Sequence, residues 1–321
     1  EDDFVEHFFV ASTKAYLLCF TNKGQMYWLK VHRIPTASRT SAGRSIANVL
    51  SLKPEEKITS IVPVREFTPE WNLMMATRNG TVKKTELMAY SNVRAGGIIG
   101  ITIDEGDELI GVCLTRLEDE VVLATRNGMA IRFSEADARA MGRTARGVRG
   151  IKLGKDDEVV GMVVADPEGH LLSVTENGYG KRTPFGANTD PSLLASQDEG
   201  SETESEAEQP SDTVSEDSEL ETDPSGMRYR IQRRGGKGLK DVKVTAKNGR
   251  VVGIASARPG DEIMVITQQG MVTRSRVDDI RIVGRNTQGV KVMTPAEGDK
   301  IVTIAKVASE NIVEPPAESP A

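Results

Sequence analysis

The sequence predicts an all-β protein whose short strands form a disc of four-stranded blades. A pattern of about fifty residues recurs about five times along the 321-residue chain, and each copy holds two turns between short apolar runs. Repeats of this length with four short strands are typical of propellers, in which each sheet covers its faces with neighbouring blades. A solenoid of strands is the alternative.

Each repeat begins with a hairpin. An apolar run ending in threonine leads into a polar turn that ends in glycine, and Asn-Gly between two such runs is a strong hairpin signal, because a type I′ turn needs positive φ at both central residues. The five turns are residues 22–24, 78–80, 126–128, 176–178 and 268–270. The runs before them are residues 16–20, 73–77, 121–125, 171–175 and 263–267.

A second strand rich in cations follows each hairpin turn, and a loop containing arginine and glycine follows that strand. These loops are residues 39–44, 94–97, 143–150, 233–238 and 285–289. Each repeat then ends with an alternating strand, a polar turn and an apolar strand, as in residues 98–103, 104–107 and 108–114, or 242–245, 247–249 and 251–254. The interval between turn glycine and loop glycine is much longer in the fourth repeat than in the others, which predicts an insertion there.

The insertion explains the charge of the chain. Twelve acidic residues and no basic one lie between Asp198 and Asp223; without them, 35 acidic residues remain against 41 basic ones, so the net charge changes from −6 to +6. The stretch 188–225 has too few large apolar residues to fold alone. It is either a solubilising loop or an internal competitor for a basic surface.

The loop at residues 232–238, Gln-Arg-Arg-Gly-Gly-Lys-Gly, is the densest cationic segment. Glycines let backbone N–H groups approach an anion, and the cations attract it. A basic glycine loop alone is often a solvated turn. Its fixed place within a repeat favours phosphate binding.

The remaining composition excludes several classes. No apolar run approaches the eighteen residues of a membrane span, and the first residues show no basic region followed by an apolar one, so we expect a cytoplasmic protein. Cys19 and Cys113 lie in apolar strand patterns that favour buried thiols. His7, His32 and His170 have no partners at metal or acid–base spacing, and a nucleotide-binding glycine loop is absent. We therefore expect no catalytic residue, metal or cofactor in this chain.

Residues 232–238 resemble the signature box of the C-terminal domain of the A subunit of bacterial DNA gyrase. Segments 76–84, 139–151, 177–183 and 282–289 support the resemblance, which covers almost all of the chain outside the insertion and the tail after about residue 307. It implies a six-bladed β-pinwheel, a propeller-like disc with swapped strands that wraps duplex DNA with positive handedness around a basic rim. ATP-driven strand passage by the holoenzyme would then introduce negative supercoils.

The resemblance also implies partners and cofactors outside the chain. The partners are duplex DNA and, in a heterotetramer, the B subunit together with the cleavage core of the A subunit; ATP and Mg²⁺ serve the rest of the holoenzyme. The dipeptide Arg228-Tyr229 resembles the arginine-tyrosine pair used for DNA cleavage, but no winged-helix pattern surrounds it. We expect a non-catalytic module.

The position of the box departs from the family. It usually belongs to the first blade, whereas here it lies in the fourth visible repeat. Either the chain begins just after an original first box, or this lineage relies on the later one; five visible repeats against six expected blades favour the first. The predicted organisation is blades over 1–187, an acidic disordered insertion over 188–225, blades over 226–307 and a flexible tail over 308–321.

The predicted DNA-binding residues combine the box with cations of the other repeats, although for any cation outside the box a solvated surface position is the alternative. They are Gln232, Arg233, Arg234, Gly235, Gly236, Lys237, Gly238, Lys83, Lys84, Arg143, Arg146, Arg149, Lys181, Arg182, Arg274, Arg276 and Arg285. Two other functions stay open. The related module of topoisomerase IV binds DNA without strong wrapping and normally lacks an intact box, and a propeller could instead serve as a protein-interaction platform.

Overall fold

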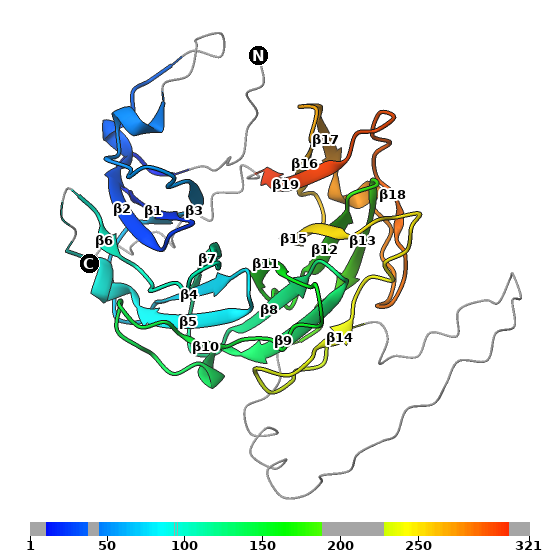
Figure 1. The fold of residues 1–321 in the computed structure, drawn as a ribbon, viewed down its shortest axis with the longest axis horizontal. Coiled ribbons are helices and arrows are strands. Elements are labelled where there is room, and N and C mark those ends of the chain that lie inside the picture. Colours follow the sequence, from blue (N-terminus) through cyan, green and yellow to red (C-terminus); the bar gives the residue numbers. More distant parts are fainter. Residues whose placement is uncertain (1–10, 38–44, 93, 95, 188–227, 308–321) are drawn as a thin grey trace, which may run out of the picture.

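The computed structural model describes residues 11–37, 45–92, 94, 96–187 and 228–307. The predicted insertion and tail therefore lie outside the described residues, as does the first arginine-glycine loop. The described chain forms five antiparallel sheets, which we number as blades 1 to 5 in chain order (Figure 1).

The strands of each blade follow in their order across the sheet. Blade 1 contains β3 (Ile58–Val64), β1 (Tyr16–Thr21), β2 (Gln25–Lys30) and β6 (Ile98–Ile99). Blade 2 contains β10 (Val148–Arg149), β5 (Thr81–Glu86), β4 (Asn72–Thr77) and β7 (Leu109–Thr115), and blade 3 contains β11 (Val159–Val164), β8 (Glu120–Thr125), β9 (Met129–Ser134) and β14 (Leu239–Lys240). Blade 4 contains β15 (Val251–Ala257), β12 (His170–Thr175), β13 (Tyr179–Pro184) and β18 (Val290–Lys291), and blade 5 contains β17 (Val272–Arg276), β16 (Glu262–Thr267) and β19 (Ile301–Val307). Short 3-10 helices connect them: η1 (Val31–Arg33), η2 (Ile46–Asn48), η3 (Leu87–Tyr90), η4 (Glu135–Asp137) and η5 (Val277–Asp279).

The outer strand of blades 1 to 4 is swapped, because it comes from the repeat that follows. β6 lies after the hairpin of blade 2 in the chain but pairs with β2 of blade 1, and β10, β14 and β18 repeat this pattern one blade further on. In the described residues β17 has no such partner. The propeller-like class is confirmed with five blades; a sixth is not seen in the described part.

The hairpin turns are where the sequence places them, but their type differs from the prediction. Three residues separate the strands in blades 1 to 4 and four in blade 5. The turn glycine donates its N–H to the threonine carbonyl, as from Gly80 to Thr77 (3.0 Å), and only the glycine has positive φ. Asn79 does not adopt the left-handed conformation. In blades 1 to 4 these are three-residue loops with glycine in the left-handed region rather than type I′ turns.

The inner strands β3, β7, β11, β15 and β19 follow one another around the centre of the disc (Figure 1). They line a central cavity of about 500 Å³, to which each of the five contributes residues. The hydrophobic cores lie between the blades instead. Successive residues of one strand face opposite neighbours: Leu73 and Met75 pack against blade 1, whereas Met74 and Ala76 pack against blade 3.

The alternating strands predicted before the polar turns are shorter than expected, whereas the apolar strands after those turns form β7 and β15. Of residues 98–103 only β6 pairs as a strand, and residues 242–245 contribute one bridge, from Val242 to Thr287. These segments cross the edge of the preceding blade, so only two residues of each run alongside it.

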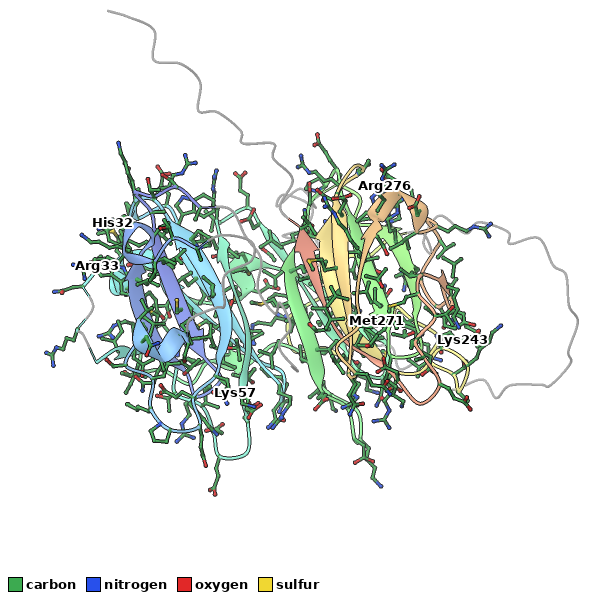
Figure 2. The ribbon with its side chains drawn as sticks, turned by 90° about the horizontal axis from the view of Figure 1, so that it is seen from above. His32, Arg33, Lys57, Lys243, Met271 and Arg276 are labelled. Atoms are coloured by element: carbon green, nitrogen blue, oxygen red, sulfur yellow. The ribbon has the colours of Figure 1, made fainter. Side chains whose placement is uncertain are left out.

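Edge-on, the disc has two distinct faces (Figure 2). His32 and Arg33 of η1 and Arg276 next to η5 lie toward one face, whereas Lys57 and Met271, which follows a hairpin turn, lie toward the other. The swapped strands β6, β10, β14 and β18 form the rim between these faces (Figure 1). The arginine-glycine loops of the described chain therefore all reach one continuous surface.

Candidate nucleic-acid interface

Four segments cross the rim, and each contains one swapped strand. We call them straps and number them by repeat: strap 2 (94 and 96–103), strap 3 (139–153), strap 4 (228–244) and strap 5 (281–294). A glycine with positive φ lies close to the preceding blade in straps 3 to 5. A Cβ atom would lie 2.5 Å from the carbonyl oxygen of Val82 at Gly147 and 2.6 Å from that of Ala130 at Gly238. Only glycine fits such a site, so these glycines fix the register of the straps.

Backbone hydrogen bonds join each strap to the next. Strap 2 donates from Thr102 to Ala145 of strap 3 (3.2 Å), strap 3 from Lys152 to Gly236 of strap 4 (2.8 Å), and strap 4 from Lys243 to Thr287 of strap 5 (3.0 Å). The N–H of each donor and the carbonyl of each acceptor occupy equivalent places in successive repeats. The rim is therefore a continuous hydrogen-bonded belt.

Exposed cations recur on this belt at fixed distances from the strap glycines Gly147, Gly238 and Gly289. The second residue of each short strand β10, β14 and β18 is a cation with an exposed side chain, and so is the residue eight positions before the glycine. Two further positions carry cations in straps 3 and 4. The exposed cations at these four positions are Arg139, Arg146, Arg149 and Lys152 in strap 3, Arg230, Lys237, Lys240 and Lys243 in strap 4, and Arg281 and Lys291 in strap 5; Arg94, Arg228 and Arg233 are exposed on the straps at other offsets.

Seven of these cations were not among the predicted site residues. They are Arg139, Arg230, Arg281, Lys152, Lys240, Lys243 and Lys291. The signal that finds them is their constant offset from the strap glycine, which can be read from the sequence once the glycines are aligned. Arg146, Arg149, Arg233 and Lys237 lie on the belt as predicted, and Arg146 also contacts Asp104 in an exposed ion pair (2.8 Å), a type of contact that is worth little in water.

Residues 232–238 form a tight turn, and three of their backbone N–H groups donate to carbonyls of the protein. The N–H of Gly235 donates to Gly150 O (2.7 Å), and that of Gly236 donates to Arg233 O (3.3 Å). The N–H of Gln232 is bonded to Arg132 O (2.7 Å). Gly238 is needed for the fit against blade 3 rather than for an approach to an anion. In this loop Arg233 and Lys237 are the exposed cations.

Arg234, Arg143 and Arg285 occupy equivalent strap positions and are partly buried. Arg234 Nε donates to Asp137 O (3.1 Å) and its Nη1 to Arg149 O. Arg143 donates to Ile99 O (3.3 Å) and Arg285 to Arg228 O (2.8 Å). Each of these three guanidinium groups thus donates to backbone carbonyls of the preceding repeat.

Four predicted DNA contacts are contradicted, because Lys83, Lys84, Lys181 and Arg182 are buried inside the blades. Lys83 Nζ donates to the carbonyls of Gly100 (2.5 Å) and Arg143, and Lys84 pairs with Glu135 (2.8 Å). Burial lowers the pKa of Lys83 to about 7. The swapped straps cover the strand that carries these cations, so their side chains hold the straps rather than DNA.

The equivalent cations of blade 4 are held in the same way. Lys181 Nζ lies 2.8 Å from Asp241 Oδ1 and 3.1 Å from Gly284 O, and Arg182 pairs with Asp278 (3.1 Å). Burial lowers the pKa of Lys181, while Asp241 opposes that shift. Lys83 has no equivalent of Asp241. Asp241 is the third residue after the glycine of strap 4, and the third residue after the glycine of strap 2 is Gly100, which has no side chain.

Blade 5 brings the last predicted cations to the rim. Arg274 and Arg276 are exposed on β17, and a cavity of about 630 Å³ is lined by both and by Lys291. Arg274 also pairs with Glu262. These two arginines extend the row of cations beyond strap 5.

Tyr229 is not an exposed nucleophile. It is 2% exposed, its hydroxyl donates to Asp241 Oδ1 (2.6 Å), and burial raises its pKa well above the usual value for tyrosine. Cys19 is buried and Cys113 is half-buried, and burial raises the pKa of each thiol to about 12. Within the described ranges no cluster of metal-ligating side chains forms, and no helix is long and apolar enough to cross a membrane.

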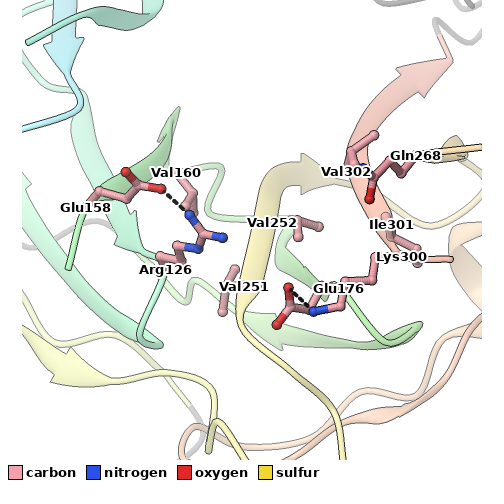
Figure 3. A pocket seen from close by; sticks show the side chains of 10 residues that line it. All are labelled: Arg126, Glu158, Val160, Glu176, Val251, Val252, Gln268, Lys300, Ile301 and Val302. Carbon is pink, nitrogen blue, oxygen red and sulfur yellow. Dashed lines mark hydrogen bonds and ion pairs between the residues drawn. The ribbon is translucent and has the colours of Figure 1, made fainter. Parts of the chain in front are cut away.

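A third cavity, of about 390 Å³, lies between the turn ends of blades 3 to 5 (Figure 3). Its two cations are both paired with carboxylates, Arg126 with Glu158 (2.7 Å) and Lys300 with Glu176 (3.2 Å). A pocket whose charges are already neutralised does not favour an anion. The pair of Lys300 and Glu176 joins blades 4 and 5, whereas Arg126 and Glu158 both belong to blade 3.

A swapped-strand propeller with a cationic belt defines the class of this chain, and the comparisons with known proteins specify it further. The family model described as "DNA gyrase C-terminal domain, beta-propeller" matches residues 15–65, 72–112, 119–166, 169–186, 228–258 and 261–308. The DNA gyrase A subunits of Salmonella typhimurium and Clostridium acetobutylicum are both 42% identical to it, over 96% and 97% of this chain but only 30% and 32% of their own lengths. The chain belongs to the family of DNA gyrase A C-terminal domains.

Solved structures agree on the fold. A structure of the DNA gyrase A C-terminal domain matches with a TM-score of 0.70 at 21% identity, covering 93% of this chain and 84% of the other. The C-terminal domain of DNA topoisomerase IV matches with a TM-score of 0.71 at 26% identity, covering 92% and 80%. The chain spans about a third of the length of the curated relatives.

Proposed function

We propose that this chain binds duplex DNA along the belt of straps and wraps it with positive handedness. The observation that carries the proposal is the row of exposed cations at constant offsets on a curved, continuously hydrogen-bonded rim. Bending a duplex over one to two helical turns costs roughly 1–6 kcal/mol, so a wrap needs attraction at regular intervals rather than at one point. The belt offers such intervals from blade 2 to blade 4.

The recognition is of phosphate and not of sequence. Arginine and lysine side chains on an open surface neutralise backbone charge without reading base edges. Each phosphate contact adds about 0.9 to the slope of log affinity against log salt concentration. Six contacts from the belt would therefore give a slope of roughly −5.

In the complete enzyme we propose that the wrapped segment is presented to the cleavage core of the A subunit, and that the B subunit hydrolyses ATP to drive strand passage. The family relationship supports this assignment. The chemistry, with its ATP and Mg²⁺, would lie in those partners, and the assembly would act on DNA in the cytoplasm. The result for the DNA would be negative supercoiling.

We also propose that a sixth blade completes the disc. Arg274 and Glu262 of blade 5 are equivalent to Arg132 and Glu120 of blade 3, yet the side chain of Arg132 is 2% exposed and that of Arg274 is 65% exposed. The difference arises because a strap covers the pair in blade 3. A further repeat would cover β17 in the same manner. Slow amide exchange in β17 in the full-length gyrase polypeptide, but not in this chain, would support the sixth blade, whereas equal rates would contradict it.

The topoisomerase IV type of module is the second candidate function, favoured by the similar solved structure. Such a module would bind DNA without strong wrapping. A protein-interaction platform would show no salt-dependent DNA binding. The three alternatives therefore differ in a single assay.

The test is to close nicked plasmid with ligase in the presence of this chain and to measure the linking-number change at two salt concentrations. A positive change that disappears at high salt supports wrapping. The variant Arg233→Ala/Arg234→Ala/Lys237→Ala should lose it while retaining the circular dichroism spectrum of the fold. Binding without a linking-number change would indicate the topoisomerase IV type, and an unchanged linking number in the triple variant relative to the parent would remove residues 232–238 from the mechanism.

A further inference from the structure

A buried lysine joins neighbouring straps at two places on the rim but not at residues 232–238. The lysine is the third residue after a turn glycine: Lys83 bonds strap 2 to strap 3, and Lys181 bonds strap 4 to strap 5. The same position in blade 3 is Ile131, whose side chain cannot donate a hydrogen bond. The junction between straps 3 and 4 therefore lacks this link.

Arg234 lies at that junction and reaches across it. Its guanidinium donates to Asp137 O and Arg149 O, both in the repeat before its own, and the neighbouring N–H of Gly235 bonds to Gly150 O (2.7 Å). A guanidinium holds two carbonyls at fixed angles because its N–H groups lie in one plane. The turn also contacts the apolar residue that replaces the lysine, since a Cβ at Gly236 would lie 3.6 Å from Ile131 Cδ1. The loop thus packs against the side chain of Ile131 and is held on its other side by the hydrogen bonds of Arg234.

Arg143 provides the comparison. It occupies the same strap position and donates to Ile99 O (3.3 Å), but there Lys83 already links the two straps from below. Arg233 and Lys237 differ again, since they are the exposed cations of the loop. The cations of one loop therefore have two kinds of environment.

We propose that Arg234 is a positioning residue that replaces the missing lysine link and sets the relative orientation of straps 3 and 4, whereas Arg233 and Lys237 meet the phosphates. The proposal rests on the DNA-wrapping function above. In this arrangement Arg234 determines whether the cations of neighbouring straps follow one curve. Its charge matters less than the planar reach of its guanidinium.

The test uses charge-conserving variants of the 321-residue chain. Arg234→Lys should speed the amide exchange of Gly235 and Lys152 at least several-fold without DNA, and should reduce the linking-number change by more than half while the salt slope of DNA binding stays the same. Arg233→Lys, which keeps a cation at the phosphate position, should leave the exchange rates unchanged and should reduce the linking-number change less than Arg234→Lys does. Arg143→Lys should have a smaller effect than Arg234→Lys, because Lys83 remains.

Two results would overturn the assignment: normal amide exchange in Arg234→Lys, or an equal loss of linking-number change in Arg233→Lys. The exchange measurement needs no DNA, so it tests the positioning role by itself. If the parent chain changed no linking number, the wrapping function would fail, and the exchange rates of the Arg234→Lys variant would still confirm or overturn the link.

Discussion

Lys83 illustrates at the residue scale how a charged side chain can serve the fold instead of the interface. It is fully buried, and its ammonium group donates to two backbone carbonyls from different straps. Such bonds satisfy carbonyls that would otherwise be buried without donors. The cost is the desolvation of a charge that pairs with no carboxylate of the described chain, in contrast with Lys181 and Asp241.

Because of this cost, the contribution of Lys83 to the free energy of unfolding should depend on pH. Burial, together with the nearby charge of Arg143, lowers the pKa of Lys83 from 10.5 to about 7. Between these values the unfolded chain holds a proton that the folded chain has released, so this residue's contribution to stability increases with pH, by up to about 1.4 kcal/mol per unit, and is smallest below pH 7. The difference in unfolding free energy between the parent and Lys83→Met, measured in urea at pH 6 and pH 9, should therefore shift in favour of the parent at pH 9.

Lys152→Met supplies the baseline for this comparison, because Lys152 is exposed in the folded chain. A difference between parent and Lys83→Met that stayed constant from pH 6 to pH 9 would contradict the lowered pKa.

The fit of each strap against its blade depends on the glycine at its centre. Gly238 has φ of +81° and lies where a Cβ would approach Ala130 O to 2.6 Å, whereas Gly260 has φ of +85° with no atom near the position of a Cβ. Alanine at Gly260 would be strained only by the left-handed backbone conformation, which lowers the free energy of unfolding by about 1–2 kcal/mol. Alanine at Gly238 must also displace backbone, which adds roughly 1–3 kcal/mol.

We therefore expect Gly238→Ala to lower the midpoint of urea unfolding more than Gly260→Ala does, and to abolish the linking-number change that Gly260→Ala retains. Equal destabilisation by the two substitutions would show that the close approach at Gly238 is relaxed in solution.

The elements that the sequence predicts well are those defined by local signals. Every hairpin lies at its turn glycine, and the fifty-residue repeat identifies the blades. Strand swapping is not a local signal: β14 pairs with β9 more than a hundred residues earlier through only two residues. Without that pairing, Lys84 and Arg182 resemble edge-strand cations in water. Because strand swapping is not visible locally, Lys240 and Lys291 were also missed. Their constant offset from the strap glycine indicates an exposed rim position only when each strap is known to cross the rim.

For the whole molecule, the distribution of charge matters more than its sum. The chain has a net charge of −6, but twelve acidic residues within residues 198–223 account for it, and the remainder carries +6. These residues lie outside the described part of the chain. The described residues on either side of this segment are both bonded to Arg132, which donates to Ala187 O (3.3 Å) before it and to Tyr229 O (3.2 Å) after it. Tyr229 lies only a few residues before Arg233 and Lys237 in the chain. The two described stretches that flank this segment are therefore held close to the densest cations of the belt.

A segment of twelve negative charges tethered beside a cationic surface should compete with DNA for that surface where charges are weakly screened. Deleting residues 197–224 should tighten DNA binding several-fold at about 10 mM salt, where the Debye length is about 30 Å, and much less at about 1 M, where it is about 3 Å. Because Arg132 holds both flanks, the deletion should leave the unfolding midpoint unchanged. A variant that keeps the length but replaces the acidic residues with Asn and Gln separates charge from bulk. If it binds as tightly as the deletion, charge is the cause; if both variants bind like the parent, the segment only solubilises the chain.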